Sequence, residues 1–366
     1  MKFGDFASFR YGRLPIKKKI TESGKYPIYS GYRYVGFYDE YNTEANQLII
    51  VARGVGGTGD VKFTKDRCYL TNLSIAANID SNVVLPEYLY YYFKPRSLRY
   101  LDSGSAQSQI TISDLERVMI PIPPLSDQKT ICSYLKLLDG KIQNNKQINN
   151  NLEQQAKAIF TNEFLSTETL PNGWKQGSLI DIADYLNGLA MQKYRPSNDE
   201  TGIPVLKIKE LRQGCCDDNS ELCSPNIKNE YIVHDGDVIF SWSGSLLVDF
   251  WCGGVCGLNQ HLFKVTSNFY DKWFYYSWTK HNLDRFIAVA ADKATTMGHI
   301  KRDELAKAEV IIPSIEDYNR IGALLQPIYD LIISNRIENK KLVETRDSLL
   351  PKLMSGEIDM SEVDYE

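Results

Sequence analysis

The sequence lacks the features that would point first to a membrane protein or an enzyme. No apolar stretch approaches the length of a membrane span, and no signal peptide opens the chain. No Walker-type nucleotide loop is visible, because the glycine-rich run at residues 54–59 has no lysine after it. The four histidines are scattered, so nothing local indicates a Ser/His/Asp or Cys/His site. We therefore expect a cytoplasmic, non-catalytic protein without a cofactor.

Cysteine is sparse in the first half and gathers in the second. Thiols in a cytosolic chain are most simply reduced. The spacing of Cys252 and Cys256 matches a zinc site loosely, whereas a zinc site needs four ligands closed into a tetrahedron. Ordinary buried thiols are the simpler interpretation, and we predict no metal site. The cysteines of the second half are Cys215, Cys216, Cys223, Cys252 and Cys256.

What the sequence does contain is one unit written twice. At a constant shift of 190 residues, Pro123 meets Pro313 and Asp127 meets Asp317. Upstream at the same shift, residues 48–54 meet residues 238–244, and each of these apolar runs ends at a glycine, which predicts a buried strand followed by a turn. A pseudo-symmetric chain suits a ligand that is itself roughly two-fold, and duplex DNA is the leading case.

The formal net charge of −4 is unusual for a DNA-binding chain. The excess of acidic residues lies in the second half and the tail, whereas the first 123 residues are on balance basic. Nonspecific affinity for phosphate should therefore be modest in this chain alone. If it binds DNA, a basic partner is expected to supply part of the affinity.

Each copy ends in a predicted long helix. Prolines at 121–124 and 313 exclude a helix interior there, and Ser126 or Ser314 can cap the helix that follows. Apolar residues then step by four and three for about four heptads, which predicts a coiled-coil seam. Both seams carry two asparagines at matching positions, which favours pairing of the two helices over each lying on its own domain. The seams are Ile131, Leu135, Leu138, Ile142, Asn145, Asn149, Leu152, Ala156 and Ile159, and Ile321, Leu325, Ile328, Ile332, Asn335, Asn339, Leu342, Arg346 and Leu349.

These patterns predict an α+β protein with two mixed α/β domains separated by two long helices. The helices form an antiparallel coiled coil, and the whole is a pseudo-two-fold internal repeat. A helix of this length spans about 60 Å and could act as a ruler between the domains. The expected boundaries are 1–123 for the first domain, 124–166 for the first helix, 167–312 for the second domain, 313–354 for the second helix and 355–366 for an acidic tail.

Three short segments of the sequence resemble segments of a known protein family. Residues 120–128 (IPIPPLSDQ), 170–174 (LPNGW) and 26–31 (YPIYSG) are similar to segments of type I restriction-modification specificity subunits. The resemblance implies two target-recognition domains that each read half of a bipartite, interrupted DNA site. It also implies a helical spacer that docks methyltransferase (modification) subunits, two of them, with restriction/translocase subunits joining the complex. The chain departs from the family pattern at Asp127, Asp317 and Tyr318 and in its short N-terminus.

Candidate DNA contacts are polar residues placed at loops. Arg53 follows a buried strand, where its guanidinium could reach a guanine edge, and Gln107 and Gln109 could read adenine. The lysine run at 17–19 is as well explained by a solvated loop as by phosphate contact. The candidates of the first domain are Lys17, Lys18, Lys19, Tyr32, Arg33, Arg53, Gly54, Gln107, Ser108 and Gln109. Those of the second are Lys193, Tyr194, Arg195, Lys207, Lys209, Trp242, Ser243, Asn259, Gln260, His261 and His299.

Three other functions stay open from the sequence. The chain could be the recognition module of a solitary DNA methyltransferase, a coiled-coil scaffold that does not read DNA, or a small-molecule enzyme without a familiar motif. Salt-dependent binding to a specific duplex would favour a restriction-modification specificity subunit or a methyltransferase recognition module over the scaffold and the enzyme.

Overall fold

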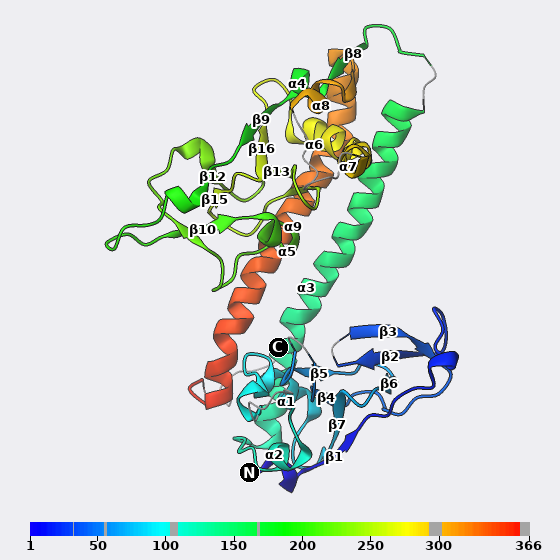
Figure 1. Ribbon diagram of the computed structural model, residues 1–366, viewed down its shortest axis with the longest axis vertical. Helices are drawn as coiled ribbons and strands as arrows, with labels where there is room; N and C mark the ends of the chain where they lie inside the picture. The colour runs from blue at the N-terminus through cyan, green and yellow to red at the C-terminus, as the bar shows by residue number, and fades with distance from the viewer. Residues whose placement is uncertain (32, 55–56, 103–108, 167–168, 293–301, 359–366) are drawn as a thin grey trace. The chain divides into compact units, whose positions relative to one another are not determined.

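The computed structural model describes the chain except residues 32, 55–56, 103–108, 167–168, 293–301 and 359–366. The chain divides into two compact units, each with its own core. Unit 1 comprises Met1–Gly140 and Leu342–Glu366, and unit 2 comprises Lys141–Lys341. Each of the two long helices, α3 (Leu125–Phe160) and α9 (Ile315–Ser355), both labelled in Figure 1, contributes one part to each unit.

Unit 1 is built on a four-stranded antiparallel sheet in the order β1-β7-β4-β5. The four residues of β4 are all buried, as a continuous apolar run predicts for a central strand. Leu48 and Ile50 face the main core, whereas Ile49 faces a smaller cluster on the other side of the sheet. The strands are β1 (Ala7–Tyr11), β4 (Leu48–Val51), β5 (Val61–Phe63) and β7 (Ser74–Ile79).

A smaller sheet and short helices complete unit 1. Its order is β3-β2-β6, with β2 antiparallel to β3 and parallel to β6. These strands are β2 (Tyr26–Ser30), β3 (Arg33–Tyr38) and β6 (Tyr69–Leu70), and the helices are η1 (Phe3–Asp5), η2 (Lys17–Lys19), α1 (Pro86–Phe93), η3 (Leu98–Leu101) and α2 (Ile112–Glu116).

Unit 2 has a main sheet of the same strand order. The order β9-β16-β13-β14 places the first, fourth, second and third strands side by side, as in unit 1. Val238 and Phe240 of β13 face the main core and Ile239 faces a second cluster, so this apolar run is also buried on both faces. The strands are β9 (Asp184–Asn187), β13 (Val238–Ser241), β14 (Leu247–Phe250) and β16 (Leu262–Thr266).

The second sheet of unit 2 has the order β11-β10-β15-β12, with β10 antiparallel to β11 and parallel to β15. The two-stranded pair β17-β8 is separate. These strands are β8 (Lys175–Ser178), β10 (Ile203–Leu206), β11 (Leu222–Cys223), β12 (Ile232–Val233), β15 (Cys256–Leu258) and β17 (Glu309–Ile312). The helices are α4 (Leu179–Ile182), η5 (Met191–Lys193), α5 (Ile208–Gln213), η6 (Asn229–Tyr231), α6 (Lys272–His281), α7 (Leu283–Asp292) and α8 (Arg302–Ala306).

Two glycines explain why the chain can pass from β1 and β9 so close to the second sheets. A Cβ at Gly12 would lie 2.3 Å from the carbonyl oxygen of Thr71, and a Cβ at Gly188 would lie 2.3 Å from that of Asn259. Any side chain at either position would collide with backbone. Gly12 follows β1 and Gly188 follows β9, the corresponding strands of the two main sheets, and the same close approach accounts for both.

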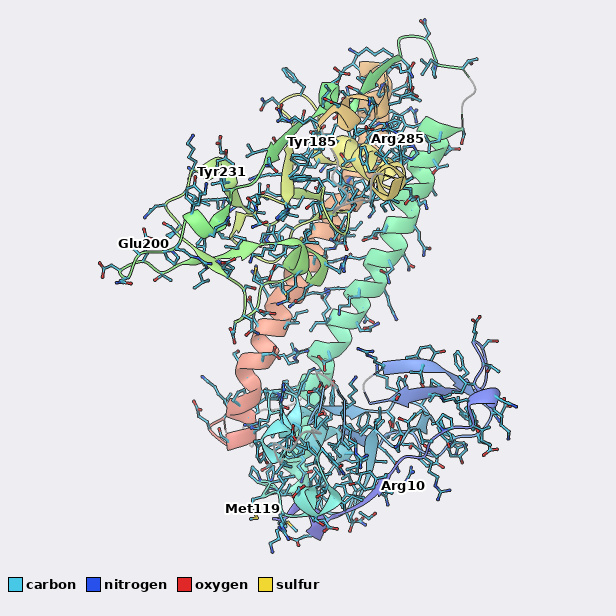
Figure 2. All side chains as sticks on the ribbon, viewed as in Figure 1. Arg10, Met119, Tyr185, Glu200, Tyr231 and Arg285 are labelled. Carbon is cyan, nitrogen blue, oxygen red and sulfur yellow. The ribbon has the colours of Figure 1, made fainter. Side chains whose placement is uncertain are left out.

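Helices α6 and α7 cover one face of the unit 2 sheet (Figure 1). Tyr185 of β9 is buried and its hydroxyl lies 2.7 Å from the Thr279 hydroxyl of α6. Arg285 of α7, also labelled in Figure 2, contacts the carboxylate of Glu304 in α8. None of the helices in the described ranges is long and apolar enough to cross a membrane.

Within each unit the two long helices contact each other. In unit 2, the side-chain amide of Asn145 in α3 donates to that of Asn339 in α9 (3.0 Å), and Asn335 donates to Asn149 (2.8 Å). As the residue number rises along α3, the number of the partner in α9 falls, so the segments are antiparallel. In unit 1, Arg346 of α9 pairs with Asp139 of α3 at 2.7 Å. A short π-helical segment, Thr161–Leu165, follows the end of α3.

Candidate nucleic-acid interface

In unit 1, Arg53 and Gln109 are brought together from distant parts of the sequence. They form an isolated antiparallel bridge just beyond β4, and the neighbouring amide of Ile110 donates to the carbonyl of Ala52 (3.0 Å). Arg53 is half-buried, and its Nε is buried without a hydrogen-bond partner among the residues that the structure describes. A buried guanidinium nitrogen without a partner is costly, and a functional role for the side chain would account for that cost. Arg53 is therefore the strongest base-contact candidate of unit 1.

The turn after Arg53 starts with Gly54, which has a φ of +140°. The carbonyl of Gly54 accepts a hydrogen bond from the hydroxyl of Thr58 at 3.0 Å. This backbone conformation favours glycine, and it lets the backbone approach a ligand closely. Gly54 is exposed beside Arg53.

The remaining candidates of unit 1 are more scattered. Lys17, Lys18 and Lys19 form the exposed 3₁₀ turn η2, and Lys19 lies 4.0 Å from Glu40. Arg33 begins β3 and is also exposed. Three predicted contacts, Tyr32, Gln107 and Ser108, lie outside the described residues.

In unit 2, the candidates at the end of β13 form one hydrogen-bonded cluster. The Ser243 hydroxyl lies 3.0 Å from Nδ1 of His261, and the His261 amide donates to the side chain of Asn259 (3.2 Å). The Trp242 ring packs at 6.3 Å from the His261 ring, centroid to centroid. Gln260 Nε2 lies 3.4 Å from Nε2 of His261. The cluster therefore brings an indole, an imidazole and the Gln260 amide together, whereas Ser243 and Asn259 are themselves buried.

This cluster occupies the same place on its sheet as Arg53 does in unit 1. Trp242 and Ser243 follow β13, as Arg53 follows β4, and the two strands have the same neighbours in their sheets. His261 precedes β16, the counterpart of β7 in strand order. Each unit thus gathers polar side chains at the corresponding end of its central strand.

The basic candidates of unit 2 are engaged by carboxylates. Glu221 pairs with both Arg195 and Lys207, and Asp217 pairs with Lys209 at 3.1 Å. The hydrogen bond from Lys207 and the charges of Lys207 and Arg195 lower the pKa of Glu221 despite some desolvation. A DNA phosphate would have to compete with these carboxylates for Arg195, Lys207 and Lys209. Lys193, at the end of η5, and Tyr194, which follows it, are exposed. His299 lies outside the described residues.

Sequence reasoning missed two polar residues at these sites. Asn187 ends β9, and its side-chain oxygen accepts from the indole of Trp242 at 3.0 Å, which fixes the ring plane. In unit 1, Arg10 on β1 borders an open hollow of about 840 Å³ together with Asn78, Gln47 and Tyr41 (Figure 2). Arg10 alternates along β1 with inward-facing residues, and that alternation was the only signal available for it.

No group of His, Cys, Asp and Glu side chains suited to a metal ion occurs in the part of the chain that the structure describes. Cys68, Cys132, Cys223, Cys252 and Cys256 are buried free thiols, whereas Cys215 is exposed and Cys216 is half-buried. Burial raises the pKa of Cys252 to about 11, which suits a packed thiol.

The chain is similar to proteins of one kind. It is 28% identical to the type I restriction enzyme MjaIX specificity subunit of Methanocaldococcus jannaschii, over 80% of this chain and 74% of that protein. It is 21% identical to the HindI specificity subunit of Haemophilus influenzae, over 76% of this chain and 79% of that one. The crystal structure of a type I restriction-modification S subunit from M. genitalium superimposes with a TM-score of 0.65 at 17% identity, covering 96% of this chain and 95% of that one, and so has the same fold.

A family profile matches the chain at two places. Residues 1–154 and residues 171–344 each match the profile described as type I restriction modification DNA specificity domain. Each match includes one of the two main sheets and one half or more of a long helix. The chain therefore belongs to the family of type I restriction-modification DNA specificity proteins.

Proposed function

We propose that this chain is the sequence-specific DNA-binding subunit of a type I restriction-modification complex and reads a bipartite, interrupted site. The double match to a DNA specificity domain carries the proposal, because each match covers a sheet of the same strand order. Two domains with the same frame and different polar residues at the same place suit two different half-sites. The chain would act in the cytoplasm and contribute recognition, not catalysis.

The first target-recognition domain is residues 1–123 and the second is residues 167–312. Residues 124–166 and 313–354 form an antiparallel coiled coil that separates them, and residues 355–366 are an acidic tail. The asparagine pairs between α3 and α9 support this arrangement, since a buried polar layer favours one register. A fixed register would hold the gap between the half-sites constant.

Base reading is assigned to the residues that each unit gathers at its central strand. In the first domain, Arg53 is suited to a guanine edge, because a guanidinium can donate to O6 and N7 together. In the second, the half-buried Gln260 carries an amide suited to adenine, and the buried Asn259 accepts from the backbone amide of the neighbouring His261. The basic side chains of Arg195, Lys207 and Lys209 are secondary phosphate contacts, since Glu221 and Asp217 compete for them.

The partners in this proposal are double-stranded DNA, two methyltransferase (modification) subunits and restriction/translocase subunits. The net charge of −4 supports dependence on a partner, because a chain with an excess of acidic residues has little nonspecific affinity for phosphate. A basic methyltransferase subunit would supply what this chain lacks.

Methylome sequencing of cells with and without this gene tests the proposal. We expect one interrupted motif to lose its methylation when the gene is removed and to regain it when the gene is restored. Retention of every methylated motif in the deletion strain would contradict a specificity role. Purification of the tagged chain then separates the two DNA readings, since a restriction subunit in the complex identifies a restriction system and its absence identifies a solitary methyltransferase.

A further inference from the structure

Two cysteines of unit 2 lie within contact distance of each other without being bonded. The sulfur atoms of Cys216 and Cys256 are 3.5 Å apart. Cys256 is the first residue of β15 and is completely buried, whereas Cys216 lies in the segment between α5 and β11 and is half-buried. A disulfide needs the sulfurs at about 2.05 Å, so the two sulfurs would have to approach by about 1.5 Å.

The environment makes the two thiols chemically unequal. A hydrogen bond from Cys256 lowers the pKa of Cys216, while the same contact, together with burial, raises the pKa of Cys256. Since the thiolate is the nucleophile, Cys216 is the reactive sulfur of the pair. Its neighbour Cys215 is exposed, so solvent and small solutes reach this segment.

We propose that Cys216 and Cys256 form a thiol–disulfide site that a peroxide oxidises. The Cys216 thiolate attacks one oxygen of hydrogen peroxide, the O–O bond breaks, and Cys216 becomes a sulfenic acid. The hydroxide that leaves takes up the proton released by the Cys216 thiol and becomes the first water. The Cys256 sulfur then attacks the Cys216 sulfur, the S–O bond breaks, and the Cys256 proton leaves with the hydroxyl as water. Two thiols lose two electrons, one peroxide gains them, and two waters form. A thiol reductant reduces the disulfide and restores both thiols.

The Cys216–Cys256 disulfide would restrain a segment whose carboxylates neutralise basic side chains of the same unit. Residues 214–221 carry Asp217 and Glu221, the partners of Lys209, Lys207 and Arg195. In the reduced protein the segment is tied by these ion pairs and by hydrogen bonds such as that from the Asp217 amide to Ser220 (3.0 Å). A covalent link to β15 would hold the carboxylates against the bases more firmly.

Peroxide treatment of the full chain, followed by thiol titration in denaturant and a non-reducing peptide map, tests the site. We expect two fewer titratable thiols than the seven of the reduced chain, a linked peptide that joins Cys216 to Cys256, and recovery of both thiols with a reductant. Amide hydrogen exchange across residues 214–221 should slow in the oxidised form. Retention of all seven thiols, or a linkage that excludes Cys256, would overturn the proposal.

Matched variants separate this pair from its neighbours. Cys216→Ser removes a half-buried thiol, so the chain should fold, and it should abolish the linked peptide. Cys215→Ser and Cys252→Ser should each leave the Cys216–Cys256 linkage intact, because neither removes one of its sulfurs. Loss of the linkage in Cys215→Ser would show that the exposed thiol, not Cys216, reacts. The map of the unmodified chain decides the matter even if a variant folds poorly.

Discussion

The side-chain amide of Asn335 in α9 donates a 2.8 Å hydrogen bond to the side-chain oxygen of Asn149 in α3, and both residues are buried. Asn149 in turn donates to the carbonyl of Ile332 at 3.2 Å. Buried amides are stabilising only while each has a partner, so this pair penalises any other register of the two helices.

Asn149→Leu alone should therefore destabilise the chain. It leaves the amide of Asn335 buried without its acceptor, at a cost of about 1–3 kcal/mol in the free energy of unfolding. The double variant Asn149→Leu with Asn335→Leu replaces the polar layer by an apolar one and should be at least as stable as the natural chain. Urea denaturation of the three proteins measures this. Additive losses in the double variant would show that the pair does not act as one layer.

Arg336 joins three elements of unit 2. Its guanidinium contacts Asp249 of β14 at 2.7 Å and Glu153 of α3 at 2.9 Å from its place on α9. Arg336→Met should lower the free energy of unfolding by roughly 2 kcal/mol or more, because two carboxylates lose their shared cation. This is somewhat less than the about 3–5 kcal/mol lost when a fully buried ion pair is broken. Arg320→Met is the control, because the Arg320 guanidinium is exposed where it contacts Glu163 and Asp317, and it should change stability by less than about 1 kcal/mol. Equal effects in the two variants would contradict the role of Arg336.

Asp139 predicts an acid-sensitive contact in unit 1. Burial alone would raise the pKa of Asp139, but the hydrogen bond from Arg346 and the charge of Lys94 outweigh burial and lower this pKa below its ordinary value of 3.8. A depressed pKa in the folded state stabilises the fold above the unfolded pKa, and this contribution disappears as pH falls through the folded pKa. Asp139→Asn should thus be less stable at neutral pH and should lose less stability on acidification below about pH 4. Denaturation midpoints across this range test it, and parallel curves for both proteins would refute it.

Arg53→Ala should weaken binding to the specific duplex by about 1–3 kcal/mol if Arg53 makes a bidentate guanine contact, and it should spare nonspecific binding. The assay is duplex binding by the complex with its methyltransferase subunits, at fixed salt. A uniform loss on all sequences would identify a phosphate contact instead. Lys18→Ala in the exposed η2 turn is a matched removal of one positive charge from unit 1. No change for Arg53→Ala would remove this residue from the interface.

Local patterns predicted the parts of the fold that depend on neighbouring residues. The apolar runs at Leu48–Val51 and Val238–Ser241 are buried central strands, because a run without polar alternation needs cover on both faces. The predicted helices begin at Leu125 and Ile315, directly after the prolines that exclude a helix interior. The seam positions of both helices are buried or half-buried.

Long-range pairings were not predictable from the same patterns. Nothing near Arg53 indicates that Gln109 would bridge to it, and Asn187 is separated from Trp242 by 55 positions in the sequence. The sequence also showed Lys207 and Lys209 as available bases, whereas the fold brings Glu221 and Asp217 against them. Each of these contacts depends on how a loop returns to the sheet, and hydrophobic periodicity carries no information about that.

The coiled-coil ruler makes a prediction about the gap between half-sites. Deleting residues 140–146 from α3 and residues 338–344 from α9 removes one heptad from each helix and takes out Asn145 and Asn339 together. It retains the Asn149–Asn335 and Asp139–Arg346 pairs. The matched deletion should fold, because the seam stays continuous, whereas either single deletion should be destabilised by mispaired seams.

The matched deletion shortens the helix pair by about 10 Å at 1.5 Å per residue, or about three base pairs, and so also rotates one domain around the DNA axis. It should therefore methylate a site with a shorter gap or lose activity through lost helical phase. Methylome sequencing with this variant as the sole specificity gene distinguishes these outcomes from a third. An unchanged gap at full methylation would show that the helices do not set the spacing, and contacts between the domains and the partner subunits would then have to do so.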